Sequence, residues 1–261
     1  MIGAKLDRKL KLWLASLVAL AAVNVALWFW IARSAPSHSR YVESQLLLSG
    51  IYVGVCGFRS LFPRVDLERV CLWDTWLSAI LLGRTLATVA EVCFALQCVL
   101  FLQRLADIAH VPALAVAAQV FVPLVIVAEA ACWYAVLSLD HIGHAVEETL
   151  WALLMLMLAV GAGAAAASAA GPLRWLLVAG CVVYGIGAAL TLAIDVRMYV
   201  RRWRTNAAVP RLPLASGLRD SGLRRQPTRA WAVWREEVPW MTVYFSIGVW
   251  TSLAMVLLDW A

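Results

Sequence analysis

The sequence predicts an all-α protein of the membrane, a polytopic bundle of about seven transmembrane helices. The first observation is composition: of 261 residues, 63% are hydrophobic and 15% are charged, whereas soluble domains are about half apolar and about a quarter charged. The second is the length of the apolar segments, because about 20 residues are needed to cross a hydrocarbon core of about 30 Å. The third is the sorting of Lys and Arg between alternate loops, as membrane proteins show. We expect a single transmembrane domain over residues 1–261.

Seven segments read as spans: Trp13–Ala32, Glu43–Phe58, Asp74–Gln103, Pro112–Leu137, His144–Ala169, Leu173–Tyr199 and Pro239–Trp260. The first follows a cluster of lysines and keeps bulky Trp28 and Trp30 near its end, so an uncleaved signal anchor fits better than a cleaved signal peptide. The second is short and contains three glycines. A tilted or re-entrant element is therefore the alternative to a full crossing over residues 43–58.

The later segments carry further marks of membrane helices. Pro112 and Pro239 stand where a helix begins, and proline is favoured in the first turn. The fifth segment ends in the small residues of Gly161–Gly171, which allow close approach of a neighbouring helix. These features favour transmembrane helices that pack closely against one another.

The basic residues predict the orientation, because Lys and Arg of short loops stay in the cytoplasm. With seven crossings, one side collects the lysines before Leu12, the arginines of residues 59–69 and the run from Arg197 to Arg235. The opposite side receives only four arginines: Arg33, Arg40, Arg104 and Arg174. We therefore expect the amino terminus in the cytoplasm and the carboxyl terminus outside, in the cytoplasmic (inner) membrane of a bacterium. Six crossings would separate the two basic clusters.

Residues 201–238 form the longest polar segment, a basic cytoplasmic loop that we expect to be mostly irregular. Trp231 and Trp234 stand three residues apart near its end, a spacing that predicts a short interfacial helix. The net charge of +6 arises mainly in such loops and indicates attraction to anionic membrane lipids. It does not indicate binding to nucleic acid.

Polar residues gather at the start of the fifth span, in Asp140, His141, His144, Glu147 and Glu148. At about 100° per residue they fall within about 120° of one helix face. Ionisable side chains are costly inside a membrane, so they mark a functional site by default. The alternative is a pair of interfacial histidines followed by solvated glutamates, since acids are favoured at a helix N-terminus.

Four further ionisable residues lie within predicted spans: Arg84, Glu91, Glu129 and Asp195. Arg84 and Glu91 share a helix face, but their positions are about 10 Å apart along the axis, so we expect each to need a partner on another helix. Carboxylates outnumber cations among these residues. Either several are protonated or a bound cation supplies the missing charge.

The histidines favour a metal, because imidazole combined with carboxylate suits zinc, iron or manganese. We expect His141, His144 and Glu148 as the core ligands. Glu129, Glu91 and Asp195 would complete a mononuclear or dinuclear site of iron or zinc. Glu147, next to the ligands, is the candidate general acid or base, and Arg84 could bind an anionic group of the substrate. A structural ion pair is an equal alternative for Arg84, and pairing with a nearby arginine is one for Asp195.

The leading hypothesis is a membrane metalloenzyme that acts, oxidatively or hydrolytically, on a lipid-soluble substrate from the cytoplasmic leaflet. A proton- or cation-coupled transporter or channel is the second hypothesis, and a non-catalytic membrane subunit is the third. The four histidines are too few for the histidine-rich membrane desaturases. All lysines precede Leu12, which excludes a retinal-binding lysine within a span.

Overall fold

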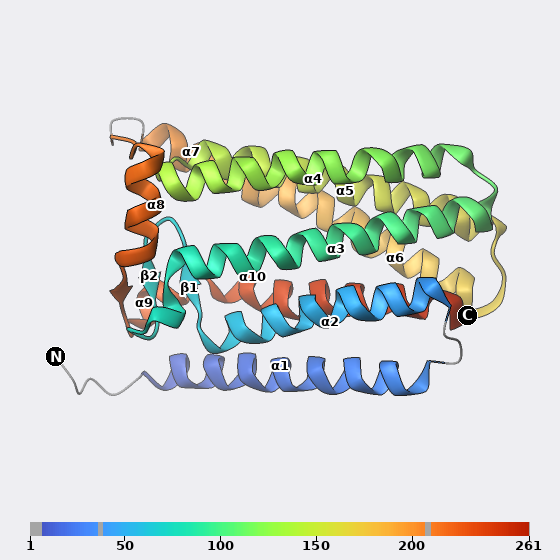
Figure 1. The fold of residues 1–261 in the computed structure, drawn as a ribbon, viewed down its shortest axis with the longest axis horizontal. Helices are drawn as coiled ribbons and strands as arrows, with labels where there is room; N and C mark the ends of the chain where they lie inside the picture. Colours follow the sequence, from blue (N-terminus) through green and yellow to red (C-terminus); the bar gives the residue numbers. More distant parts are fainter. Residues whose placement is uncertain (1–6, 36–38, 207–209, 261) are drawn as a thin grey trace. The chain divides into compact units, whose positions relative to one another are not determined.

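The computed structural model describes residues 7–35, 39–206 and 210–260, and nearly all of this chain is helical (Figure 1). The chain divides into two compact units. The first contains the described residues up to Phe94 together with Arg219–Val256, and the second contains Ala95–Leu218 and the last residues from Leu257. Helices α3 (Ile80–Ala109) and α8 (Leu214–Leu223) run from one unit into the other.

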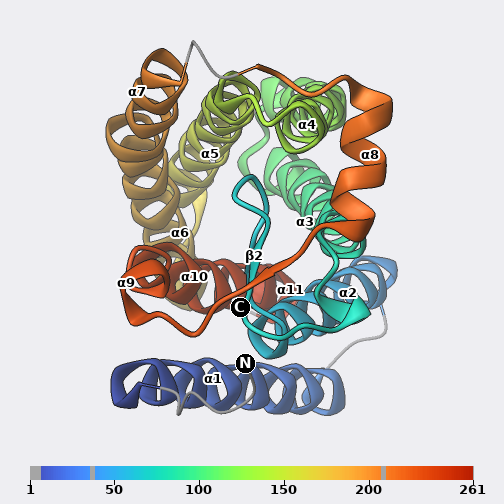
Figure 2. The same ribbon diagram turned by 90° about the vertical axis from the view of Figure 1, so that its left-hand side faces the viewer.

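The first unit is built on α1 (Arg8–Ser34) and α2 (Arg40–Leu61), which pack side by side (Figure 2). Each begins at a capping side chain: Asp7 accepts from the Lys9 amide and Ser39 from the Val42 amide, which satisfies N–H groups that the helix itself cannot. A second helical segment of this unit runs through α10 (Val238–Val243), η3 (Tyr244–Gly248) and α11 (Val249–Val256). The middle part, η3, is π-helical.

A small three-stranded sheet joins the connection between α2 and α3 to residues 226–227 and was not predicted from the sequence. Its strands are β1 (Arg64–Val65), β2 (Val70–Cys71) and β3 (Gln226–Pro227), in the order β1-β2-β3. β1 pairs antiparallel with β2, and β2 pairs parallel with β3. The short helices η1 (Trp76–Ser78) and α9 (Trp231–Trp234) also belong to this unit.

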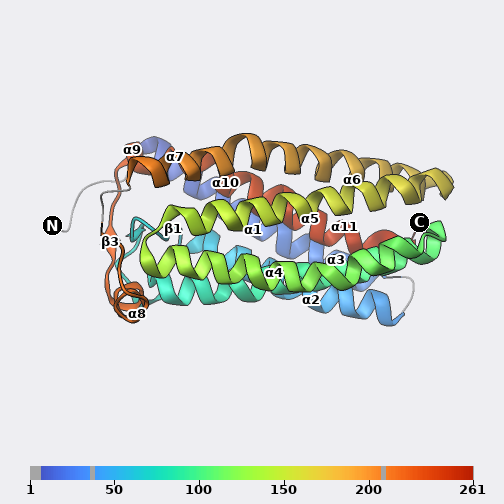
Figure 3. The same cartoon turned by 90° about the horizontal axis from the view of Figure 1, so that it is seen from above.

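The second unit consists of the later part of α3, α4 (Pro112–Ser138), α5 (His141–Ser168) and a long segment formed by α6 (Gly171–Leu190), η2 (Thr191–Val196) and α7 (Arg197–Thr205). Figure 3 shows α5 between α4 and α6. The turn from α4 to α5 uses Leu139 in the left-handed conformation, with φ of 60°. η2, like η3, is π-helical. The last short helix is η4 (Leu257–Trp260).

Within the part of the chain that the structure describes, five helices are long and apolar enough to cross a membrane: Arg8–Ser34, Ile80–Ala109, Pro112–Ser138, His141–Ser168 and Gly171–Thr205. They coincide with five of the predicted spans. The remaining two predicted segments, residues 43–58 and 239–260, are helical but fall outside this group. The predicted all-α class, with helices long and apolar enough to cross a membrane, thus agrees with the structure apart from the small sheet, while the number of crossings, the positions of the termini and the single-domain organisation stay predictions.

The polar segment 201–238 is more regular than expected, since it contains α8, α9 and β3 in addition to the end of α7. Trp231 and Trp234 form α9, the short helix that their spacing predicts. Trp234 is fully buried, however, and its ring lies 5.9 Å from that of Trp13 on α1. It therefore contributes to the core of the first unit.

Asn24 joins α1 to the π-helical segment. It is 3% exposed, its amide donates to the Phe245 carbonyl at 2.7 Å, and its oxygen accepts from Trp250 Nε1 at 3.0 Å. Asn24→Leu should leave both partners unsatisfied and lower the free energy of unfolding by about 1–3 kcal/mol. Thermal denaturation of the purified protein in detergent measures this. Val23→Leu, at a position 49% exposed, is the control, and equal melting temperatures for the two variants would contradict the assignment.

Candidate metal centre

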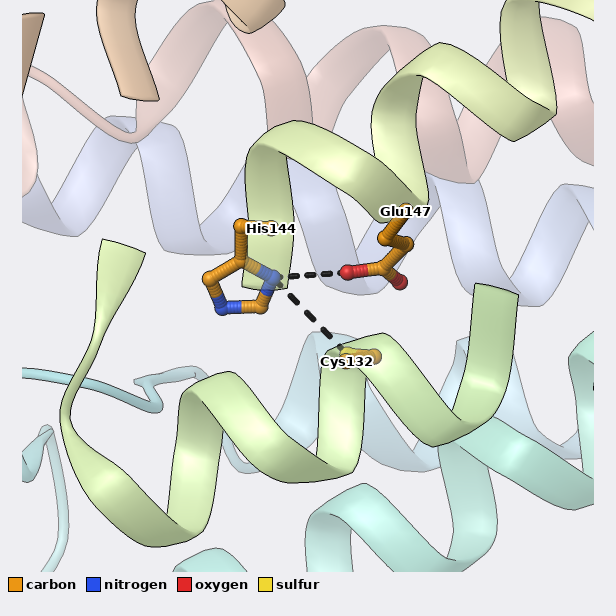
Figure 4. Close-up of side chains that lie close together, drawn as sticks. All are labelled: Cys132, His144 and Glu147. Atoms are coloured by element: carbon orange, nitrogen blue, oxygen red, sulfur yellow. Dashed lines mark hydrogen bonds and ion pairs between the residues drawn. The ribbon is translucent and has the colours of Figure 1, made fainter. Parts of the chain in front are cut away.

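Three potential metal ligands meet between α4 and α5 in the second unit (Figure 4). His144 Nδ1 lies 2.6 Å from Glu147 Oε2 and 3.8 Å from Cys132 Sγ. All three ligand atoms lie within 4.8 Å of one another. The Cys132 residue is fully buried, and the side chains of His144 and Glu147 are 12% and 8% exposed. The group is therefore compact and nearly inaccessible to water.

The local sequence explains this arrangement. Asp140 caps α5 by accepting from the Ile142 amide, which fixes where the helix begins. His144 and Glu147 then stand three residues apart, a spacing that places both on one face. Cys132 faces them from α4 (Figure 4).

Gly143 allows the two helices to approach at this level. A Cβ atom at Gly143 would lie 2.3 Å from the Ala131 carbonyl oxygen and 2.8 Å from the Ala135 Cβ. Only a residue without a side chain fits there, and the neighbouring His144 is consequently brought against Cys132.

The hydrogen-bonding capacity of His144 is exceeded by its neighbours. Both the carboxylate of Glu147 and the thiol of Cys132 approach the same ring nitrogen, Nδ1 (Figure 4). One nitrogen carries at most one proton and can act either as donor or as acceptor. A metal cation held between the three atoms could be ligated by all of them at once.

The distances are compatible with such an ion. Zinc–ligand bonds of about 2.0–2.3 Å in tetrahedral geometry separate two ligand atoms by roughly 3.3–3.6 Å. The distance of 3.8 Å between Sγ and Nδ1 is close to this range. The distance of 2.6 Å between Nδ1 and Oε2 would increase by roughly 0.7 Å on binding, which a side-chain rotation of Glu147 can provide.

Glu129 adds a second carboxylate to the group. It is buried on α4, one turn before Cys132, and a carboxylate oxygen lies within 4.8 Å of that of Glu147. Two carboxylates this close repel each other unless a proton or a cation lies between them. The prediction placed Glu129 near the histidine motif, and the structure brings it there.

Tyr199 of α7 covers the histidines. Its ring centroid lies 4.9 Å from that of His144 and 6.2 Å from that of His141. The preceding π-helical turn, η2, carries Asp195, which is half-buried. Such turns occur frequently at functional sites, and this one sets the position of Tyr199 on the next turn of the helix.

The structure does not group all the expected ligands. Of the described residues, those whose ligand atoms converge on His144 are Cys132 and Glu147, rather than His141 or Glu148. His141 is buried beside Tyr199, and Glu148 is half-buried on α5. The carboxylate of Glu147, expected as the acid or base, is the one that lies beside the His144 imidazole and the Cys132 thiol.

Asp140, the first residue of the polar motif, has a structural role. It accepts from the Tyr134 hydroxyl at 3.1 Å and pairs with Arg211 at 2.8 Å, in addition to capping α5. These contacts hold the turn between α4 and α5 and the chain that leads into α8.

The expectation that Arg84 and Glu91 would not meet was wrong. Arg84 Nη2 bonds to Glu91 Oε2 within α3 of the first unit, and Arg84 Nε also lies 3.5 Å from the Thr88 hydroxyl. The axial rise separates the two backbones, but both side chains are long and extend toward each other along one face. Because Arg84 is paired with Glu91, the hypothesis that Arg84 binds an anionic group of the substrate is weakened.

Cys132 was not among the ligands expected from the sequence. A signal was present in the spacing Glu129-x-x-Cys132, since this spacing places a carboxylate and a thiol on one helix face. The spacing alone could not show that His144 lies opposite.

An apolar groove of about 290 Å³ lies along α5 and the η2–α7 segment. It is lined by Ile142, Ala145, Val146, Thr149, Leu150, Val196 and Val200. These α5 residues lie on a different face of the helix from His144 and Glu147, so the groove is separate from the ligand group.

No known protein-family model matches the chain, and neither a curated protein nor a solved structure is found to be similar to it. The function must therefore be argued from the site itself.

Proposed function

We propose that this protein is an integral membrane metalloenzyme, in which Cys132, His144 and Glu147 hold a transition-metal ion that acts on a lipid-soluble substrate. The observation that carries the proposal is the convergence of sulfur, nitrogen and oxygen ligand atoms within 4.8 Å in a buried position. Three protein ligands with a fourth position for water or substrate are characteristic of catalytic zinc. In a membrane helix, such costly residues indicate function.

The ligand chemistry favours zinc, with iron as the second candidate. Thiolate, imidazole and carboxylate together suit zinc, which would lower the pKa of a bound water and polarise a carbonyl for hydrolysis. Iron in the same position would support oxidation. Because Glu147 occupies a ligand position, Glu129 takes the role of acid or base, with its carboxylate within 4.8 Å of that of Glu147.

The proposal includes seven crossings, with the amino terminus in the cytoplasm, in the cytoplasmic (inner) membrane of a bacterium. Support comes from the length of α2, whose 22 residues at about 1.5 Å each extend about 33 Å. This exceeds the hydrocarbon thickness of about 30 Å. The basic residues then gather on one side, as they do in membrane proteins.

Element analysis of the protein purified in mild detergent tests the metal. We expect about one transition-metal ion per chain, and cobalt substitution should give a thiolate-to-cobalt absorption band. Cys132→Ser should abolish this band, whereas Cys181→Ser, which alters a half-buried thiol on α6, should not. Wild-type protein with no more metal than the Cys132→Ser variant would contradict the proposal.

A further inference from the structure

Arg64 of β1 is a buried cation with unmet hydrogen-bonding capacity. Its side chain is 1% exposed, and among the described residues Nε and Nη2 have no hydrogen-bond partner. Nη1 is 3.5 Å from the Leu77 carbonyl oxygen, and the nearest carboxylate oxygen, Oδ1 of Asp66, lies 3.8 Å from Nε. Nε and Nη2 form one edge of the guanidinium, with parallel N–H bonds that suit an oxyanion.

Arg69 of the same hairpin is a buried arginine whose N–H groups do have hydrogen-bond acceptors. It is also fully buried, but Nε bonds to Asp220 at 2.9 Å and Nη1 donates to the Asp66 carbonyl at 2.7 Å. Arg69 is therefore paired with a carboxylate and a carbonyl, whereas two N–H groups of Arg64 have no hydrogen-bond acceptor among the described residues. The Asp66 carboxylate, 3.8 Å from Nε, compensates the Arg64 charge only in part, and buried N–H groups without hydrogen bonds are unfavourable.

The surroundings of Arg64 are positive. Its guanidinium packs on Gly83, in the first turn of α3, where a Cβ would lie 1.6 Å from Cζ. A helix N-terminus carries partial positive charge. Burial, opposed by the charge of Asp66 and assisted by the neighbouring Arg59 and Arg84, lowers the pKa of Arg64 to about 10. Arg64 is still a cation at neutral pH.

Arg59 adds a second cation without a carboxylate. It is 8% exposed, and its guanidinium lies 5.7–5.9 Å from the ring centroids of Trp240, Tyr244 and Phe245. Among the described residues it forms no ion pair. Arg84, by contrast, is neutralised by Glu91.

We propose that Arg64, supported by Arg59 and the N-terminus of α3, binds the phosphate group of an anionic ligand through its Nε and Nη2 edge. Asp66 is the intramolecular competitor: its Oδ1 is buried without a hydrogen bond, close to the edge that the phosphate would occupy. Because α3 is one of the helices able to cross a membrane, its start lies at headgroup depth. The phosphate can therefore come from a lipid or from solution.

The melting temperature of the full chain in neutral detergent tests this, with sodium phosphate compared to sodium chloride at equal ionic strength. At about 100 times the dissociation constant, phosphate should raise it by roughly 5–10 °C. Arg64→Met should not respond to phosphate. Asp66→Asn should respond at lower phosphate concentration.

Vesicles of phosphatidylcholine with and without phosphatidic acid distinguish the sources. A rise in melting temperature only with phosphatidic acid identifies a lipid headgroup, and a rise with both phosphatidic acid and inorganic phosphate identifies a site open to solution. Gly83→Ala, which displaces the guanidinium but keeps the charge, should abolish the response in either case. Absence of any response, or a response retained in Arg64→Met, would overturn the proposal. So would loss of stability in Asp66→Asn without tighter phosphate binding, because Asp66 would then be the permanent partner of Arg64.

Discussion

Glu147→Gln is expected to abolish binding of the proposed metal, whereas Glu148→Gln is expected to retain it. Glu147 Oε2 lies 2.6 Å from His144 Nδ1 within the ligand group, while Glu148 is outside that group. Loss of a hydrogen-bonding partner of a ligand typically lowers metal affinity about 10–100-fold, so loss of a ligand itself should exceed roughly 100-fold. Competition with a chelator of known affinity measures the change.

The two variants are matched controls for each other. Each replaces one carboxylate by an amide, at adjacent positions of α5, so their effects on helix propensity and net charge are nearly equal. The sequence motif alone assigns the reverse roles, with Glu148 as ligand and Glu147 as acid or base. Metal retained in Glu147→Gln and lost in Glu148→Gln would therefore favour that assignment over the geometry described here.

The helices were predictable because their signal is local. Each long apolar run in the sequence must satisfy its backbone groups internally in a membrane, and only a helix does so within one segment. The ends were partly predictable too: Pro112 begins α4, and Asp140 caps α5. The small sheet was not, because β2 pairs with residues 226 and 227, far along the chain, and its strands are only two residues long.

Spacing along one helix predicted part of the site, and Glu129 of α4 was expected beside it. His144 and Glu147 were singled out because their spacing places them on one face. The position of Cys132 beside His144 depends on how α4 packs against α5, and the spacing of residues within one helix does not predict that packing. The same limit applies to Arg64, which reads as an ordinary loop cation in the sequence but is buried by the sheet and by the absence of a side chain at Gly83.

The role of side-chain length explains the error over Arg84 and Glu91. The expectation that they would not pair rested on the helix rise, which gives the distance between their backbone positions only. The structure shows the two side chains meeting despite that rise. Whether two long ionisable side chains on one helix face can pair depends on their length along the helix axis as well as on the distance between their backbone positions.

Gly143→Ala should lower stability strongly. The new Cβ would lie 2.3 Å from the Ala131 carbonyl oxygen and 2.9 Å from the Ala135 nitrogen, both backbone atoms of α4. Backbone cannot rotate away as a side chain can, so α4 and α5 must separate. We expect a loss of about 3 kcal/mol in the free energy of unfolding, at the upper end of overpacking effects. Denaturant or thermal unfolding in detergent measures it.

Separation of the helices should also reach the ligand group, because Gly143 precedes His144 while Cys132 follows Ala131. Metal affinity should therefore fall together with stability in Gly143→Ala. Gly185→Ala is the control: it lies on α6 of the same unit, and nothing lies within 4 Å of its Cβ position, so it should be neutral or stabilising by about 0.5–1 kcal/mol. If Gly143→Ala and Gly185→Ala unfolded alike and bound metal alike, α4 and α5 would not be in the contact that brings Cys132 to His144, and the candidate metal centre would lose its structural basis.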